Sequence, residues 1–249
     1  MQEFIAISNI TKEIKNSADL LKTLDINALI VGDSGVGKKT LARYISKDAQ
    51  IFDAKELQND IADKIINLND KTIIVDKIEN LTNIELFINW AETTNTRILA
   101  TTQKKELSSN LNDLFSITLE IPPLEKRKED IKPLAKKFSK EAGLILAIDT
   151  APGKLIINTS KNAHSLRKSI YFSYLFESIG ENEIMMLLEN YMLDNMQGEN
   201  SYRDFQYLFE APLLKASQKK YKSQVQMAKH LGLNRITLRK KLDNYKDLL

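Results

Sequence analysis

The chain contains short, almost uninterrupted apolar runs, separated by stretches in which apolar residues recur every three or four positions. Four such runs lie at residues 28–31, 71–76, 97–102 and 117–121, and they are rich in residues that favour strands. Strands that are apolar on both faces are typical of a parallel sheet with helices on both sides. The pattern therefore predicts an α/β fold with a parallel sheet built from these four strands.

Helical periodicity fills much of the remaining chain. Residues 5–24 predict one or two helices at the sheet edge, and residues 82–92 predict another, whereas residues 51–70 are ambiguous. Two consecutive prolines must end the fourth strand. Beyond them, residues 124–180 have helical periodicity throughout and predict a helical lid. Residues 182–198 predict an apolar helix, either a core helix, which we prefer, or a surface for a partner.

The turn after the first strand carries the pattern G-x-x-x-x-G-K. Between a strand and a helix, this pattern binds phosphate through successive backbone N–H groups and the first turn of the helix. Its lysine reaches the terminal phosphates as a point charge. The alternative is a glycine-rich turn without a ligand. The predicted nucleotide-binding residues of this loop are Gly32, Asp33, Ser34, Gly35, Val36, Gly37, Lys38 and Lys39.

A carboxylate downstream completes the predicted nucleotide site. The second strand ends in Asp76, which would orient Mg²⁺ or a water molecule bound to it. We therefore expect ATP or ADP as the ligand, with Mg²⁺ at Asp76. The Ser or Thr that usually follows the loop lysine and holds the ion is replaced by Lys39, and Thr40 would point about 100° away around the helix.

Amino-acid composition and charge exclude several classes of protein and predict one kind of partner. Cysteine is absent, which excludes disulfides, thiolate catalysis and cysteine-ligated zinc. The sequence contains neither an apolar run of the roughly 20 residues that span a bilayer nor a signal pattern at its start, so we expect a soluble cytoplasmic protein without membrane contact. The net charge is +3, but residues 217–249 hold nine Lys or Arg against two Asp. This basic tail predicts a polyanionic partner.

The basic tail also has the pattern of two short helices. Residues 224–231 and 235–242 flank a turn in which Gly232 permits a left-handed conformation and Asn234 caps the second helix. This predicts a helix-turn-helix whose second helix enters the major groove of double-stranded DNA. A solvated basic hairpin is the alternative. The predicted DNA-binding residues are Arg235 and Thr237 for base edges, and Arg239, Lys240 and Lys241 for phosphates.

Three ordered motifs carry a resemblance to a known family. The loop GDSGVGKK at residues 32–39, with LAR at 41–43, resembles the GESGTGKE-LVAR phosphate loop of the NtrC-class bacterial enhancer-binding proteins, the AAA+ activators of sigma-54 RNA polymerase. Residues 121–135 (IPPLEKRKEDIKPLA) are similar to the LPPLRERREDI-PLA signature of that family. Residues 209–214 and 224–242 resemble its Fis-type helix-turn-helix, so the resemblance covers nearly the whole chain.

The resemblance implies three parts and several partners. Residues 1–122 would form a P-loop AAA+ α/β subdomain, residues 123–196 the helical lid, and residues 197–249 an all-α Fis-type DNA-binding domain. The lid would place His164 where the family has a nucleotide-sensing arginine, and Arg167 could substitute for it in part. The C-terminal domain would form a homodimer, although its amphipathic face could instead pack on its own domain. The resemblance also allows a larger AAA+ oligomer or a mixed one.

Departures from the family pattern bear on activity. The 38 positions from Lys38 to Asp76 leave no room for the GAFTGA loop that touches sigma-54, which argues against sigma-54 contact and polymerase remodelling. Lys77 replaces the glutamate that activates water, and a protonated lysine cannot act as a base. Leu111 and Ile117 stand where the family has its arginine fingers. No receiver or ligand-sensing domain precedes residue 1, so the usual input is expected to be missing.

Two hypotheses follow from these observations. In the preferred one, the chain is a sequence-specific DNA-binding regulator that binds ATP or ADP and hydrolyses it slowly or never. In the alternative, it is an active AAA+ ATPase that works as an oligomer with a different base and finger. A phosphate loop kept only for folding is a third, weaker possibility.

Overall fold

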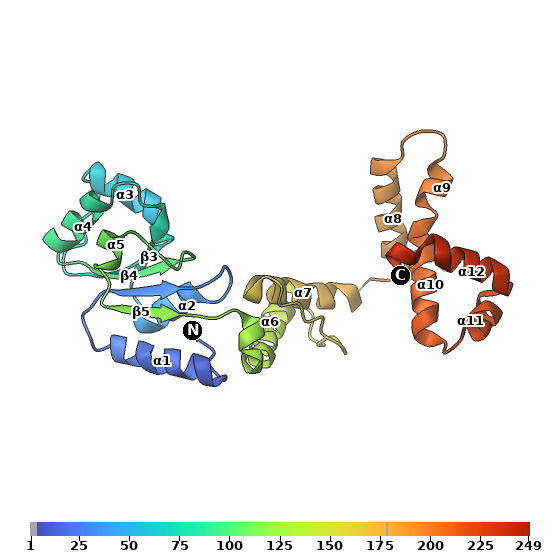
Figure 1. The fold of residues 1–249 in the computed structure, drawn as a ribbon, viewed down its shortest axis with the longest axis horizontal. Coiled ribbons are helices and arrows are strands. Elements are labelled where there is room, and N and C mark those ends of the chain that lie inside the picture. The colour runs from blue at the N-terminus through green and yellow to red at the C-terminus, as the bar shows by residue number, and fades with distance from the viewer. Residues whose placement is uncertain (1–3, 178) are drawn as a thin grey trace. The chain divides into compact units, whose positions relative to one another are not determined.

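The computed structural model describes residues 4–177 and 179–249 of the chain. Contacts divide the chain into two compact units, Met1–Ser178 and Ile179–Leu249. The first unit contains the sheet, and the second is built from helices and their connections (Figure 1). Residues 179–196, which the resemblance would place in the lid, lie in the second unit.

A five-stranded sheet forms the centre of the first unit. Its strands lie in the order β2-β3-β4-β1-β5, and every neighbouring pair is parallel. The strands are β1 (Ala28–Val31), β2 (Gln50–Asp53), β3 (Thr72–Asp76), β4 (Arg97–Thr102) and β5 (Ile117–Glu120). The four predicted strands are thus confirmed, and β2 is an additional strand at one edge.

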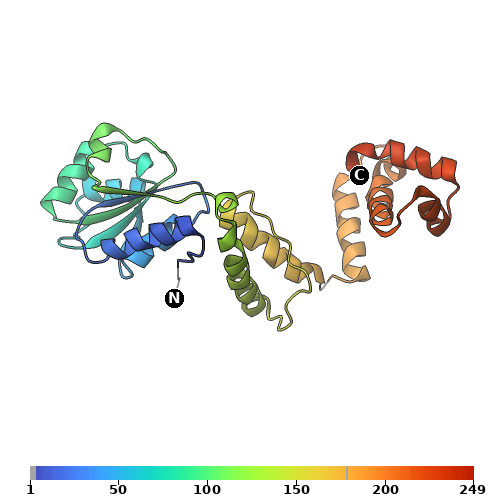
Figure 2. The ribbon, with the colours of Figure 1, turned by 60° about the horizontal axis from the view of Figure 1, so that its bottom comes forward.

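Helices cover both faces of this sheet (Figure 1, Figure 2). One face packs on α1 (Asn9–Leu21) and α2 (Lys38–Ile45), and the other packs on α3 (Ala54–Ala62), α4 (Ile84–Thr93) and the short α5 (Ser109–Asn112). Successive side chains of a strand point to opposite faces, so Ile30 packs with α1 and α2 while Leu29 packs with the other three helices. Because both faces are buried, β1 is apolar at all four positions.

Two helices form the lid of the first unit. They are α6 (Ile131–Leu146) and α7 (Asn162–Glu177), and they share a core that includes Leu166 and Ile170. The expectation of helix throughout residues 124–180 is confirmed only in part, because α6 ends at Ala147 in a left-handed conformation. The segment that follows runs along α7 without helical structure, and the Ile156 N–H donates to Ser173 Oγ over 2.8 Å.

A buried ion pair joins the lid to the sheet. Arg127 and Asp130 are almost fully buried, with 3.6 Å between Arg127 Nη1 and Asp130 Oδ2. The Arg127 guanidinium also donates to the backbone oxygen of Val36 in the glycine-rich loop. Asp130 accepts hydrogen bonds from the N–H groups of Ile7 (2.7 Å) and Ser8 (2.9 Å). The loop, the start of the lid and the N-terminal segment are therefore held at one point.

The second unit has a small core. Its helices are α8 (Glu181–Asn195), α9 (Ser201–Phe205), α10 (Tyr207–Lys220), α11 (Gln224–Leu231) and α12 (Arg235–Asn244). The buried cluster consists of Leu214, Met227, Ala228 and Leu238. The preferred interpretation of residues 182–198 as a core helix is not supported, because α8 buries none of its residues.

The turn between α11 and α12 has the geometry that the sequence predicted. Gly232 adopts a left-handed conformation with φ of 65°, and Asn234 caps α12 by accepting a hydrogen bond from the Thr237 N–H at 2.7 Å. No helix in residues 4–177 or 179–249 has both the length and the apolar character needed to cross a membrane.

Candidate functional site

The glycine-rich loop joins β1 to α2 and curls around the ammonium group of its lysine. Gly35 and Gly37 have φ values of 79° and 106°, a region that favours glycine. Lys38 Nζ donates to the backbone oxygens of Gly32 (2.6 Å) and Asp33 (2.9 Å). Burial lowers the pKa of Lys38, while nearby carboxylates act in the opposite direction. Two carbonyl oxygens of the loop thus hold the lysine ammonium group close to the start of α2.

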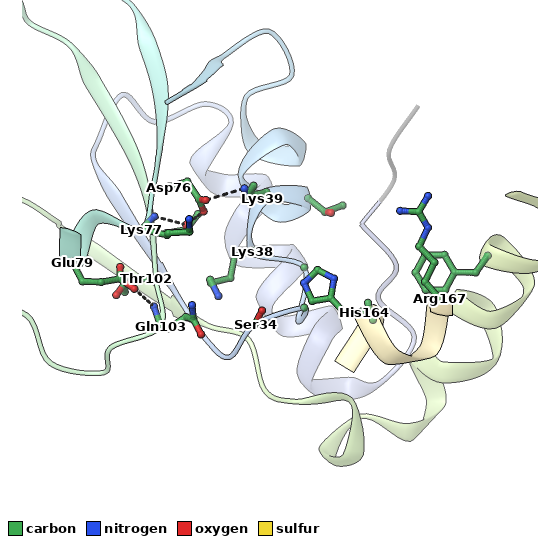
Figure 3. A pocket seen from close by; sticks show the side chains of 16 residues that line it. Ser34, Lys38, Lys39, Asp76, Lys77, Glu79, Thr102, Gln103, His164 and Arg167 are labelled. Atoms are coloured by element: carbon green, nitrogen blue, oxygen red, sulfur yellow. Dashed lines mark hydrogen bonds and ion pairs between the residues drawn. The ribbon is translucent and has the colours of Figure 1, made fainter. Parts of the chain in front are cut away.

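The loop forms one wall of a pocket of about 400 Å³. The other walls come from the ends of β3 and β4, from the turn after β3 and from the lid (Figure 3). The predicted site residues that line it are Ser34, Gly35, Gly37, Lys38, Lys39, Asp76, His164 and Arg167. Gly32, Asp33 and Val36 do not line it, and the Val36 side chain is buried in the core. The structure therefore brings together predicted residues that lie up to 133 positions apart.

Asp76 lies at the end of β3 with both carboxylate oxygens engaged. Its Oδ1 accepts a hydrogen bond from Thr101 Oγ1 at 2.6 Å, and its Oδ2 is 2.8 Å from Lys39 Nζ (Figure 3). Burial acts to raise the pKa of Asp76, but the hydrogen bonds from Lys39 and Thr101 outweigh it and hold this pKa below its usual value. The carboxylate is therefore ionised, and the Lys39 ammonium group is its ion-pair partner.

These residues do not fit a magnesium ion held by the protein. Mg²⁺ requires free oxygen ligands, whereas the Asp76 oxygens are already paired and the hydroxyl that usually supports the ion is replaced by Lys39. Residues 4–177 and 179–249 contain no group of three His, Cys, Asp or Glu side chains arranged to hold a metal. The Lys39 ammonium group lies at the Asp76 carboxylate, where the sequence predicts Mg²⁺.

The lid is fastened directly to the glycine-rich loop. The Ala163 N–H donates to the Gly35 oxygen (3.1 Å), and Asn162 Nδ2 donates to the Ser34 oxygen (3.0 Å). A Cβ atom on Gly35 would lie 2.7 Å from Cδ2 of His164, so the imidazole ring rests against the loop (Figure 3). Arg167 lines the same pocket but is engaged in an ion pair with Glu141 of α6.

Sequence reasoning missed several residues of the pocket. Glu79 lies on the turn after β3, where its Oε1 accepts a hydrogen bond from the Gln103 N–H (3.1 Å). Its Oε2 is buried and, within the described part of the chain, has no hydrogen-bond partner. The one signal in the sequence was its position three residues after Asp76. Thr40, Thr101, Thr102 and Gln103 also line the pocket.

Comparisons with known proteins agree with this fold. Residues 5–124 match the family model described as Sigma-54 interaction domain. The matched residues hold the whole sheet, the glycine-rich loop and Asp76. No curated protein matches the chain.

Solved structures of NtrX from Brucella abortus show a similar fold. The ATP complex has a TM-score of 0.58 and 15% identity and covers 97% of this chain and 69% of that chain. The ADP complex has a TM-score of 0.55 and 14% identity and covers 97% of this chain and 69% of that chain. A third NtrX structure has a TM-score of 0.56 and 15% identity and covers 96% of this chain and 68% of that chain. At these identities the similarity establishes the fold alone.

The stretches that depart from the sigma-54 activator pattern are also compact in the structure. From Lys38 to Asp76 the chain forms α2, β2, α3 and β3 with their connections. Leu111 is buried on α5, and Ile117 begins β5. Lys77 has a left-handed backbone, and its Nζ lies 3.5 Å from Asp53 Oδ2 at the pocket edge.

The predicted DNA-binding residues lie on or near the surface of α12. Arg235, Arg239 and Lys240 are exposed, and Thr237 is half-buried at the capped first turn. The sequence left Lys241 available to solvent, whereas in the structure its ammonium group pairs with Glu210 of α10. Ile236, which the sequence did not single out, is 73% exposed beside Arg235.

Proposed function

We propose that this chain is a transcription regulator that binds ATP or ADP and double-stranded DNA and that hydrolyses nucleotide slowly or never. One observation carries the nucleotide part of this proposal: Lys38, Asp76 and His164 converge on one pocket. A phosphate loop at a helix N-terminus with a lysine cation suits a polyphosphate. The NtrX structures with ATP and ADP share the fold and support nucleotide as the ligand.

Poor hydrolysis follows from the groups around the phosphate site. Lys77 stands where a water-activating carboxylate is needed, and a protonated ammonium group cannot accept a proton. Leu111 and Ile117 supply no cation for the transition state, and loss of an arginine finger typically costs about 10³-fold or more in turnover. In this proposal nucleotide is a structural or switching ligand.

The DNA-binding part of the proposal rests on the second unit. Helices α11 and α12 flank Gly232, and exposed Arg235, Arg239 and Lys240 give α12 a basic surface. We assign Arg235 and Thr237 to base edges and the other two cations to phosphates. Residues 197–249 would form the Fis-type domain, and the 71%-exposed ring of Phe209 on α10 supports a homodimer through it.

Assembly and polymerase contact are further parts of the proposal. The family match supports AAA+ assembly, with itself or with an active relative, whereas the missing GAFTGA loop argues against contact with sigma-54. The compact course of the chain between Lys38 and Asp76 leaves no projecting loop to remodel the polymerase. We therefore propose that the regulator acts by occlusion, by DNA architecture or through an active relative.

A second candidate function is an oligomeric ATPase. The buried, unpartnered Oε2 of Glu79 in the pocket is the observation that favours it, since a carboxylate there could accept a proton from water. This alternative requires turnover that rises with protein concentration, because the missing arginine finger would have to come from another subunit.

One experiment separates these functions. Equilibrium binding of ATP and ADP and steady-state phosphate release are measured in excess Mg²⁺ for wild type, Lys38→Ala and the control Lys47→Ala, over a range of protein concentrations. Lys47 is exposed just beyond α2 and does not line the pocket. Binding that only Lys38→Ala abolishes, without phosphate release, is the expected result. Release that rises with concentration supports the ATPase, and no binding by wild type refutes both.

A further inference from the structure

We propose that the ammonium group of Lys39 takes the place of Mg²⁺ at Asp76, so that the pocket accepts the phosphates of metal-free ATP or ADP. This inference rests on the proposed nucleotide binding. It concerns the chemical form of the nucleotide, which the proposed function leaves open.

The position of Lys39 supports this role. It is the second residue of α2 and directly follows the lysine of the phosphate loop. Its Nζ is 2.8 Å from Asp76 Oδ2, yet its side chain is 57% exposed in the wall of the pocket. An ammonium group has three N–H donors, so the contact with Asp76 leaves two for phosphate oxygens. Lys39 can therefore link a carboxylate to a phosphate, as a divalent ion usually does.

The charges in the pocket also favour a metal-free nucleotide. Lys38, Lys39, Lys77 and Arg167 line it, against the carboxylates of Asp76 and Glu79. A metal-free nucleotide brings its full negative charge to these cations, whereas a magnesium-bound nucleotide has part of that charge neutralised. Mg²⁺ at Asp76 would also have to displace Lys39 and would then lie close to ammonium groups of like charge.

The other oxygen of Asp76 is also engaged. Its Oδ1 accepts a hydrogen bond from Thr101 Oγ1 at 2.6 Å, and Asp76 is 6% exposed, so a bound ion would compete with Lys39 and Thr101 for this carboxylate. A threonine at position 39 would remove the competing ammonium group and supply the hydroxyl that normally supports Mg²⁺. The substitution Lys39→Thr should therefore replace the lysine cation at Asp76 by Mg²⁺ without changing Asp76 itself.

The test measures nucleotide affinity by titration calorimetry on the full chain, in excess Mg²⁺ and in EDTA. The affinity of wild type for ATP in EDTA should be no more than about threefold weaker than its affinity in Mg²⁺. Lys39→Thr should lose about tenfold or more in EDTA and recover with Mg²⁺, because it lacks the built-in cation. Lys47→Thr makes the same change at an exposed site outside the pocket and should behave as wild type.

The outcomes distinguish this inference from the function on which it rests. If wild type binds nucleotide in Mg²⁺ but loses about tenfold or more in EDTA, nucleotide binding stands and the role of Lys39 is refuted. If Lys39→Thr keeps wild-type affinity in EDTA and its thermal unfolding is unchanged, Lys39 is not the replacing cation. If wild type binds nucleotide in neither condition, the proposed function itself fails.

Discussion

The two units of the chain differ in how they use burial. The first buries both faces of its sheet, and charged groups such as Arg127, Asp130 and Asp76 are enclosed and paired within it. The second has a cluster of four buried apolar residues, while α8 has no buried residue. The candidate pocket of the first unit is therefore built from side chains that the fold holds in place, whereas the second unit leaves many of its apolar side chains exposed.

The largest expected effect comes from the core of the first unit. Phe87 is fully buried, so Phe87→Ala should lower the free energy of unfolding by about 3–5 kcal/mol. Trp90, the only tryptophan, lies 6.1 Å from Phe87 between ring centroids, and its fluorescence can follow unfolding in urea.

A similar truncation in the second unit is the control. Tyr202→Ala changes a residue that is 85% exposed and should change stability, followed by circular dichroism, by less than about 0.5 kcal/mol. Similar losses for the two variants would contradict the difference between the units.

The next effect tests whether the second unit acts through exposed side chains. Arg235→Ala should weaken binding to a preferred duplex, selected from a random library, by about 1–3 kcal/mol and leave a scrambled duplex nearly unaffected. Fluorescence anisotropy gives both affinities. Lys240→Ala should weaken both duplexes alike and lower the salt slope by about one. If both variants affect both duplexes equally, α12 does not read base edges.

Each unit has a glycine with a left-handed backbone at which the cost of an alanine can be measured. An alanine pays about 1–2 kcal/mol in this conformation, so Gly232→Ala, with no atom within 4 Å of its new Cβ, should lose about that much. Gly35→Ala has the same backbone problem and also meets His164 at 2.7 Å, so it should lose more. Thermal unfolding of both variants measures the difference, and equal losses would mean that the lid moves aside freely.

The smallest effect concerns the ion pair between Glu210 and Lys241. Burial acts to raise the pKa of Glu210, but hydrogen bonds from Lys241 and Tyr245 outweigh it and lower the pKa. Its contribution to stability is therefore present above the unfolded-state pKa of Glu and is lost as pH falls through the lowered folded-state value. Glu210→Gln should cost up to about 1 kcal/mol at pH 7, and the loss should shrink in acid. Exposed Glu199→Gln is the control, and an effect that persists in acid would contradict this account.

Much of the first unit could be predicted from the sequence because its strands are buried on both faces and therefore apolar without interruption. The edge strand β2 has no fully buried residue, so it carries no such run and was missed. The stretch after Ala147 carries apolar residues such as Ile148 and Leu155, which pack on the lid helices in an extended segment. Composition alone does not distinguish this arrangement from helix.

The candidate site could likewise be predicted from the sequence only in part. Lys38 and Asp76 could be paired from the sequence because both follow parallel strands, whose carboxyl ends meet at one edge of the sheet. The contact of Lys39 with Asp76 depends on where a flexible side chain lies, and the contact of Asn162 with Ser34 depends on how the lid docks. Neither can be deduced from spacing along the chain.

The pair of Arg127 and Asp130 has a consequence for hydrogen exchange. It holds the Val36 oxygen on one side and the Ile7 and Ser8 N–H groups on the other. Separating the pair would leave a buried charge without a partner, which typically costs several kcal/mol. We therefore expect residues 7–8, the loop around Val36 and the start of the lid to open together, so that their amides exchange with deuterium at a shared free energy although they are distant in sequence.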